Sequence, residues 1–290
     1  MYPSRFRYEA PHSLTEAIGL LHDGGENAKV LAGGQSLVPL MKLRFASPEL
    51  VVDINNVPGL AYHTVDPDGT LRIGALCRHV DLERSDVLNP TMAAAAPLIA
   101  DPIVRNRGTL AGSLCHADPQ GDWASVVLAL GGSVVARGPN GQRTIALKDF
   151  VHGPFENALA PDEIAVEVVI PAATGTRQGG YLKLERRVGD FATVGVAVAV
   201  ETANGTVTKA GIGLTGVGGS TIAATEAARA LTGQPLTPDT ISRAADLAAE
   251  AARPRTDHRG SADYKRHMVR VFTERILSNS NGTGHEEKAA

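Results

Sequence analysis

Cysteine is nearly absent from this sequence. The 290 residues include two cysteines, Cys77 and Cys115, which lie far apart and form no C-x-x-C pair. This pattern indicates neither a disulfide framework nor a zinc site. Because iron–sulfur clusters normally take four thiolate ligands, the chain cannot hold such a cluster by itself.

Long apolar runs and an excess of charge of one sign are also lacking. No stretch approaches the roughly eighteen apolar residues of a membrane span, and the N-terminal MYPSRFRYEAPHSL has no apolar core of a secretion signal. We therefore expect a cytoplasmic protein. The formal net charge is -3, which argues against a nucleic-acid partner because binding to a phosphate backbone needs clustered positive charge.

Length and composition indicate a globular protein with two domains. Hydrophobic residues make up 43% of the chain and charged residues 20%, and 290 residues exceed the usual size of one domain. The small, polar segment AATGTRQGG at 172–180 is typical of a domain boundary. We predict domains at 1–176 and 177–280, and a disordered polar tail at 281–290.

The first region mixes helical and strand patterns. Ser13 and Glu16 form a capping-box signal for a helix over about 14–22. Strand-like runs are AKVLA, LVVDI, LRIGAL and DEIAVEVVIP, and Pro139-Asn140-Gly141 marks a hairpin. Residues 78–100 and 123–131 carry helical patterns, the first interrupted at Asn89-Pro90.

The second region reads as strands followed by helices. Three strand-like runs, YLKLERR, TVGVAVAVE and TVTKAGIGL, precede helical stretches at roughly 222–231, 238–252 and 261–278. This order predicts an α+β module with a three-stranded antiparallel sheet.

Two glycine-bearing segments have similar sequences. LAGGQSL at 31–37 and TLAGSL at 109–114 each place glycine beside a small polar residue, between an extended approach and an apolar continuation. Glycine allows positive φ and close approach of a ligand, so that backbone N–H groups can converge on an anion. One such segment is more often a simple turn, and neither is a Walker A or G-x-G-x-x-G motif. Two of them fit a dinucleotide pyrophosphate held from both sides.

Longer stretches around these segments resemble one family. AGGQSLVPLMKLR, IADPIVRNRGTLAGSLCHADPQGDW and ERRVGDFATVGVAV together resemble the FAD-binding medium subunit of molybdenum hydroxylases of the carbon monoxide dehydrogenase and xanthine dehydrogenase family. The resemblance runs in order from about Phe6 to Val271. It implies an α+β fold: a vanillyl-alcohol-oxidase-type FAD-binding domain of two α+β subdomains, followed by a smaller α+β C-terminal domain.

The resemblance also implies two FAD pyrophosphate loops. The first comprises Ala32, Gly33, Gly34, Gln35, Ser36 and Leu37. The second comprises Thr109, Leu110, Ala111, Gly112 and Ser113, where Ala111 replaces the glycine usual in the family. If that position required positive φ, the alanine would cost about 1 kcal/mol.

Further FAD contacts are implied outside the loops. They are Ala100, His116, Asp122, Ile164, Lys183 and Phe191. Asp122 would reach the ribityl or pyrophosphate side, Ile164 would contact the isoalloxazine ring, and the Lys183 cation would stabilise reduced flavin.

Some of these side chains, and some of their neighbours, also have other interpretations. Without the family, Lys183 could be a solvated strand lysine and Phe191 a core side chain. Asp118 could contact the cofactor or cap the helix near residue 123. Cys115 and His116 are interpreted as residues that line the FAD site rather than as metal ligands. Arg105 and Arg107 could contact phosphate, or they could be surface or subunit contacts.

The implied function is electron transfer through FAD. In the family, a large subunit with molybdenum–pterin hydroxylates the substrate and a small subunit with two [2Fe–2S] clusters relays electrons. The FAD of this chain would pass them to an external acceptor, in a heterotrimer that dimerises. We expect cofactor ligands here, with no catalytic residue and no metal ligand. Relatives act on carbon monoxide, purines, aldehydes or nitrogen heterocycles, with selectivity in the molybdenum subunit.

Three other functions fit parts of the sequence. A free-standing flavin-dependent oxidase or reductase of the same fold would carry a proton donor beside the ring and turn over alone. A non-enzymatic nucleotide-binding module would show no flavin spectrum. A phosphate-loop hydrolase would carry GK[ST] after its loop, which this sequence lacks.

Overall fold

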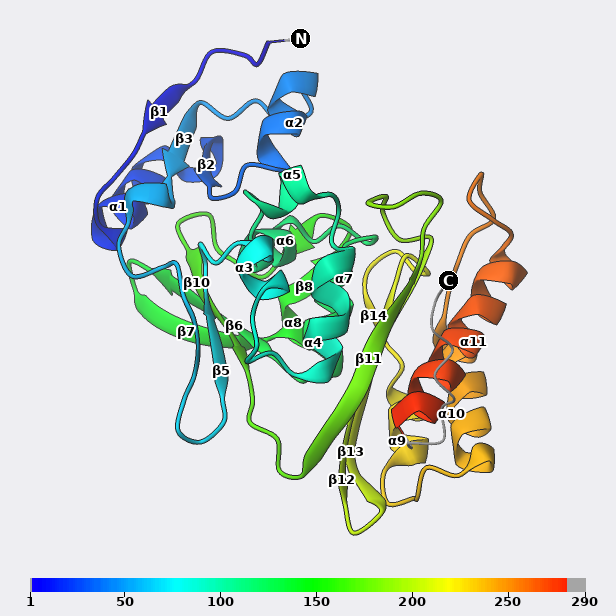
Figure 1. The fold of residues 1–290 in the computed structure, drawn as a ribbon. Helices are drawn as coiled ribbons and strands as arrows, with labels where there is room; N and C mark the ends of the chain where they lie inside the picture. Colours follow the sequence, from blue (N-terminus) through cyan, green and yellow to red (C-terminus); the bar gives the residue numbers. More distant parts are fainter. Residues whose placement is uncertain (1, 281–290) are drawn as a thin grey trace.

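The computed structural model describes residues 2–280 and has two halves built on β-sheets (Figure 1). The N-terminal half holds a three-stranded and a five-stranded sheet, together with many short helices. Its elements in chain order are β1 (Arg7–Glu9), α1 (Leu14–Gly24), η1 (Gly25–Asn27), β2 (Ala28–Leu31), α2 (Leu37–Leu43), β3 (Leu50–Asp53), η2 (Ile54–Asn56), β4 (His63–Val65), β5 (Leu71–Gly74), α3 (His79–Glu83), α4 (Pro90–Ala95), η3 (Ala96–Leu98), α5 (Pro102–Arg105), α6 (Leu110–His116), α7 (Asp122–Ala129), β6 (Ser133–Gly138), β7 (Gly141–Ala146), α8 (Leu147–Phe150), β8 (Val151–Gly153), β9 (Glu156–Asn157) and β10 (Ile164–Ile170).

The three-stranded sheet is parallel, with the order β1-β3-β2. Helix α1 begins where the sequence predicts, because the Ser13 side chain accepts a hydrogen bond from the Glu16 N–H at 3.1 Å. Its apolar face, Ala17, Ile18 and Leu21, is buried in the same core as the strands. This small sheet carries the β2–α2 connection, residues 32–36, into the cleft described below.

The five-stranded sheet is antiparallel, with the order β4-β5-β10-β6-β7. The predicted hairpin is confirmed: β6 and β7 pair from Ser133 opposite Ala146 to Gly138 opposite Gly141. The predicted helices in 78–100 and near 123–131 are present as α3, α4 and α7. A layer of short helices, α4 and α7 among them, separates this sheet from the C-terminal one (Figure 1).

The C-terminal half is a four-stranded antiparallel sheet with three helices on one face. Its elements are β11 (Thr176–Leu184), β12 (Val194–Ala203), β13 (Thr206–Thr215), β14 (Ile222–Ala223), α9 (Thr225–Leu231), α10 (Pro238–Ala251) and α11 (Ala262–Ser280). The three predicted strands and three predicted helices are present. The short fourth strand β14 was not predicted, because two residues carry no period-2 signal, and it occupies the first residues of the helix predicted at 222–231.

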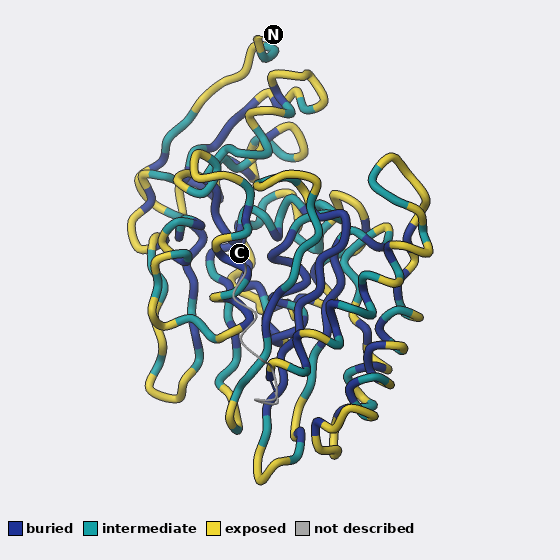
Figure 2. Tube along the Cα trace, turned by 45° about the vertical axis from the view of Figure 1, so that its right-hand side comes forward, coloured by how far each residue is buried: buried dark blue, intermediate teal, exposed yellow. Residues whose placement is uncertain are grey.

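The two halves pack closely through the other face of this sheet. A Cβ added at Gly211 would lie 1.9 Å from the Ala129 carbonyl oxygen, and one at Gly213 would lie 2.1 Å from that of Ser125. Glycine at both positions therefore lets α7 approach β13 backbone to backbone. Figure 2 shows the central strands as buried and the outward side of the C-terminal helices as more exposed.

The segment between β10 and β11 is tied down by one carboxylate. Glu201 is 3% exposed and accepts hydrogen bonds from the Thr174 N–H at 2.9 Å and from Arg177 Nη2 at 2.7 Å. The division into domains at 1–176 and 177–280 stays a prediction, and the predicted tail at 281–290 lies outside the described residues. Within residues 2–280, no helix has the length and apolar content to cross a bilayer.

Candidate functional site

A large cleft opens where the N-terminal half meets the end of β11. Its volume is about 1440 Å³, more than the roughly 300–1,000 Å³ typical of small-molecule sites. Apart from the fully buried Leu110, the residues that the resemblance implies for the FAD site all line it: Ala32, Gly33, Gly34, Gln35, Ser36, Leu37, Ala100, Thr109, Ala111, Gly112, Ser113, His116, Asp122, Ile164, Lys183 and Phe191. Segments 150 residues apart in the sequence thus share one cavity, although their individual roles toward a cofactor stay predictions.

The first glycine loop connects β2 to α2 and presents free backbone donors. Gly34 has φ +77°, a conformation that favours glycine. The backbone N–H groups of Gln35, Ser36 and Leu37 have no acceptor within the described part of the chain. These donors line the cleft at the start of a helix, where backbone N–H groups favour an anion.

The second glycine segment is helical rather than a loop. Thr109 is the N-cap of α6 and its hydroxyl accepts a hydrogen bond from the Gly112 N–H at 3.0 Å. Ala111 lies in the first turn, is 3% exposed and is not among the residues with positive φ. The strain expected if alanine replaced a positive-φ glycine is therefore absent. The sequence analysis expects a loop here, but residues 110–116 form a helix because Thr109 is a strong N-cap residue.

The two segments touch through Gly33. A Cβ at Gly33 would lie 2.2 Å from the Arg107 carbonyl oxygen and 2.7 Å from the Gly108 Cα. No flexible side chain is involved, so the backbone would have to move to admit any larger residue. Gly33 is required for this close approach, and the first loop is held against the segment that leads into α6.

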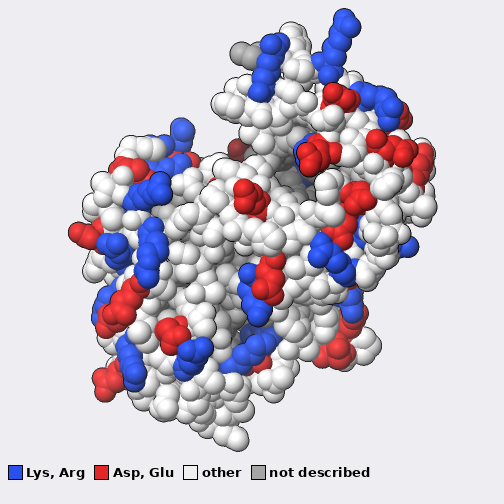
Figure 3. All heavy atoms as spheres, turned by 180° about the vertical axis from the view of Figure 1, so that it is seen from behind, with Lys and Arg blue, Asp and Glu red and all other residues white. Residues whose placement is uncertain are grey.

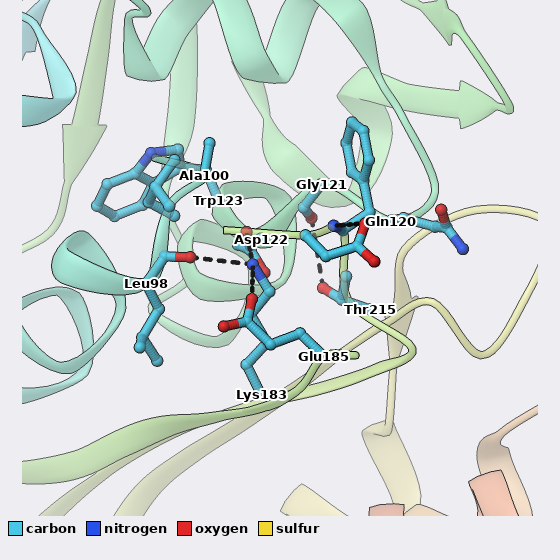
Figure 4. A network of polar contacts seen from close by, with 12 residues as sticks. Leu98, Ala100, Gln120, Gly121, Asp122, Trp123, Lys183, Glu185 and Thr215 are labelled. Atoms are coloured by element: carbon cyan, nitrogen blue, oxygen red, sulfur yellow. Dashed lines mark hydrogen bonds and ion pairs between the residues drawn. The ribbon is translucent and has the colours of Figure 1, made fainter. Parts of the chain in front are cut away.

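A buried ion pair forms one side of the cleft (Figure 4). Lys183 Nζ lies 3.1 Å from Asp122 Oδ2, donates to the Leu98 carbonyl at 2.9 Å, and lies 3.3 Å from Glu185 Oε2. The lysine side chain is 1% exposed, so it is not a solvated strand lysine.

Asp122 also accepts a hydrogen bond from Tyr181 Oη at 2.5 Å. Burial raises the pKa of Asp122, while Lys183 and the Tyr181 hydroxyl oppose that rise. Burial and the neighbouring Asp122 carboxylate raise the pKa of Tyr181 well above 10. This wall of the cleft therefore has paired charges and a neutral phenol.

His79 lines the same cleft and was missed by the sequence analysis. Its Nδ1 accepts a hydrogen bond from Trp123 Nε1 at 3.0 Å, and the residue is 4% exposed. Burial, with Arg105 and Arg78 nearby, lowers the pKa of His79 to about 4. The neutral ring accepts at Nδ1 and so carries its proton on Nε2. A lone histidine has no local signal, because its partner is 44 residues away in the sequence.

Other predicted side chains lie around the mouth and walls. Ile164, on β10, is 2% exposed, whereas Phe191 is 50% exposed and is not a core side chain. The His116 ring lies against Phe155 with centroids 5.1 Å apart. Burial raises the pKa of the Cys115 thiol to about 12, so it has little thiolate character.

Arg105 has a structural role. Its Nε lies 2.8 Å from Glu83 Oε2, and its Nη1 donates to the carbonyls of Ile99 and Ala100, each at 3.1 Å. The interpretation as a surface contact was wrong for this residue, because its side chain is 11% exposed. Ala100 has φ +46°, and Arg105 holds this turn at the edge of the cleft.

The described residues contain no group of three or more histidine, cysteine, aspartate or glutamate side chains that could hold a metal ion. On the face seen in Figure 3, acidic and basic side chains are interspersed, without a large area of one sign.

Two family models together match almost the whole chain. Residues 4–173 match the FAD binding domain in molybdopterin dehydrogenase, and residues 180–280 match the CO dehydrogenase flavoprotein C-terminal domain. The chain therefore belongs to the family of FAD-binding subunits of molybdenum hydroxylases, which are oxidoreductases.

Relatives of known activity support this family assignment. The chain is 40% identical to the carbon monoxide dehydrogenase medium chain of Hydrogenophaga pseudoflava, covering 96% of this chain and 98% of that one. It is 39% identical to subunit alpha of the 6-hydroxypseudooxynicotine dehydrogenase complex of Paenarthrobacter nicotinovorans, over 96% and 95% of the two chains.

Solved structures share the fold. The match to carbon monoxide dehydrogenase from Hydrogenophaga pseudoflava has a TM-score of 0.93 at 41% identity and covers 98% of this chain and 100% of that one. Quinoline 2-oxidoreductase from Pseudomonas putida 86 matches with a TM-score of 0.87 at 32% identity, with the same coverage. The predicted family, fold class and FAD cofactor are confirmed.

Proposed function

We propose that this chain is the FAD-carrying electron-transfer subunit of a heterotrimeric molybdenum hydroxylase. In this role it takes electrons from [2Fe–2S] clusters of a partner subunit and passes them to an external acceptor. The observation that carries the proposal is that one cleft is lined by all the residues expected at the FAD site except the buried Leu110. The chain contributes binding, orientation and electrostatics, and FAD supplies the redox chemistry when bound.

The cleft fits a dinucleotide in both size and donor chemistry. The free N–H groups of residues 35–37 suit the pyrophosphate. Ile164 offers an apolar surface for the flavin ring, and Phe191 lies exposed at the mouth. His79 lines the cleft, and its Nε2–H is left to donate to a ligand because the other ring nitrogen is occupied by Trp123.

The ion pair of Asp122 and Lys183 gives the site a fixed charge arrangement. Lys183 is held by the Leu98 carbonyl and by carboxylates on both sides, so its ammonium group cannot swing into solvent. A cation fixed in this way favours the negative charge of reduced flavin, while Asp122 keeps the wall from being strongly positive.

The remaining redox centres belong to partners in this proposal. Two cysteines cannot ligate a cluster, so the two [2Fe–2S] clusters lie on a small subunit and molybdenum–pterin lies on a large subunit. Carbon monoxide dehydrogenase medium chains among the relatives support such a division. We further propose that two heterotrimers associate.

Co-purification from the native source tests the proposal. The chain should be isolated with a molybdopterin subunit and a subunit carrying eight cluster cysteines, and its flavin should become reduced only through the cluster subunit. Turnover of a substrate by the isolated, flavin-loaded chain would instead indicate a free-standing oxidase or reductase. A folded chain that binds no FAD, alone or with its partners, would refute the flavin assignment.

A further inference from the structure

Two polar side chains outside the cleft connect its two glycine segments. Asn55 Nδ2 donates to the Ala32 carbonyl at 2.8 Å, in the first loop. Arg78 Nη2 donates to Asn55 Oδ1 at 2.5 Å, and Arg78 Nη1 donates to the Arg107 carbonyl at 2.5 Å. Neither Asn55 nor Arg78 is among the residues that line the cleft.

The Arg107 carbonyl is also the atom against which Gly33 packs. A Cβ at Gly33 would lie 2.2 Å from it, so this oxygen marks the contact between the two segments. Arg78 reaches the same oxygen from the side, and the next residue, His79, donates its backbone N–H to the Gly108 carbonyl at 3.0 Å. The Arg78–His79 pair therefore holds the chain immediately before α6 at two successive carbonyls.

Asn55 is itself fixed in place. Its backbone N–H donates to Asp53 Oδ1 at 2.9 Å, and Tyr8 Oη donates to Asp53 Oδ2 at 2.6 Å. The amide of Asn55 can thus act as a rigid spacer, with its nitrogen toward the first loop and its oxygen toward Arg78. This tie runs from the turn that follows β3, the central strand of the three-stranded sheet, to the segment before α6.

We propose that Asn55 and Arg78 are positioning residues that set the separation of the two glycine segments and thereby the affinity for FAD. The inference rests on the proposed binding of the FAD pyrophosphate between these segments. A guanidinium is suited to this role because its planar fork donates in two directions at once, whereas a lysine ammonium is a point charge. Breaking the tie lets the donors of the first loop drift relative to α6.

The test measures FAD affinity in the full-length chain after removal of its flavin. Arg78→Met and Asn55→Leu should each weaken FAD binding by about 10- to 100-fold, the range expected for losing a hydrogen bond to a charged group. Asn55 and Arg78 act through the same chain of hydrogen bonds, so their effects should not add. The double variant should therefore have about the same FAD affinity as whichever single variant binds FAD less tightly.

Arg72→Met serves as the matched control. Arg72 lies on β5, a few residues before Arg78, and pairs with Asp66 at 2.6 Å and Glu167 at 2.7 Å, away from the cleft. Like Arg78→Met, the Arg72→Met variant removes an arginine that has two partners, so it reports any general effect of such a loss on stability. Its FAD affinity should equal that of the wild type.

Chemical rescue separates positioning from a merely structural role. Ethylguanidinium added to Arg78→Ala should restore FAD binding, whereas ethylammonium at the same concentration should not, because only the former supplies two donors in one plane. If Arg78→Ala fails to fold, Asn55→Leu carries the same affinity test.

Wild-type FAD affinity in Arg78→Met or Asn55→Leu, or equal rescue by both cations, would overturn the inference while leaving the proposed function intact. A wild-type chain that binds no FAD would instead overturn the proposed function.

Discussion

The ammonium group of Lys183 lies 3.1 Å from Asp122 Oδ2, and both side chains are almost fully buried beside the cleft. Removing one partner of such a pair leaves an uncompensated charge in a low-dielectric setting. Lys183→Met should therefore lower the free energy of unfolding by about 3–5 kcal/mol. Urea unfolding of the flavin-free chain measures this change.

Lys209→Met is the control for that loss. Lys209 lies 3.8 Å from Glu201 and its side chain is 49% exposed, so an effect below about 1 kcal/mol is expected. An equal decrease in the free energy of unfolding in the two lysine variants would show that the burial of Lys183 does not increase its contribution to stability. If the Lys183→Met variant still binds FAD, the midpoint potential of its flavin should be lower than in the wild type, because a nearby positive charge is lost.

Gly33 should tolerate no side chain at all. The Cβ of Gly33→Ala would lie 2.2 Å from a backbone oxygen of residue 107, so the two glycine segments must separate and FAD retention should be lost. Gly19→Ala is the matched control, because Gly19 lies within α1 and nothing lies within 4 Å of its added Cβ. That variant should keep FAD and gain about 0.5–1 kcal/mol of stability.

Gly112→Val probes the second segment in the same way. Its Cβ would lie 2.7 Å from Thr109 Oγ1, the atom that caps α6. We expect loss of flavin absorbance with the C-terminal half still folded, as judged by limited proteolysis. Unchanged flavin content in both the Gly33 and Gly112 variants would contradict the proposed pyrophosphate site.

His79 makes stability depend on pH. The pKa of His79 in the folded chain is about 4, below the ordinary value of 6.5, so the unfolded chain binds the extra proton first as pH falls. Stability from this group is complete above pH 6.5 and declines toward pH 4, by an amount on the order of 3 kcal/mol. In His79→Gln this part of the decline should vanish in urea unfolding measured at pH 7 and pH 4. An unchanged slope would show that His79 is not buried in its neutral form.

Glu201 gives a second, more acidic transition. Burial alone would raise the pKa of Glu201, but hydrogen bonds from Arg177 and Thr174 bring it down to about 2 from 4.5. Its contribution is therefore complete above pH 4.5 and is lost as pH falls toward 2. Glu201→Gln should be less stable than wild type at pH 7 and should lose less further stability between pH 4.5 and 2. Parallel curves for the two proteins would contradict the assigned ion pair.

Local patterns in the sequence predicted most elements but not how they meet. The Ser13 cap predicted the start of α1 and the turn near residue 140 predicted the β6–β7 hairpin, because each signal lies within a few residues. The helical state of residues 110–116 was missed, since the glycine and serine there resemble a loop.

Contacts between distant segments could not be predicted at all from patterning. His79 joins Trp123, and Asn55 joins both Ala32 and Arg78, across 23 or more residues in each case. The cleft residues themselves came from the family resemblance, whose long motifs place segments without describing the packing between them. The close approach at Gly33 becomes visible only in three dimensions.

The proposed function depends on electron transfer from the iron–sulfur partner into the flavin of this chain. The most direct measurement mixes the full-length, FAD-loaded chain anaerobically with its reduced iron–sulfur partner subunit and follows the visible absorbance of flavin and clusters. The flavin band should bleach as the clusters are reoxidised, and the flavin-free Gly33→Ala chain should leave the clusters reduced. Clusters that stay reduced beside a bound, fully oxidised FAD in the assembled complex would contradict it.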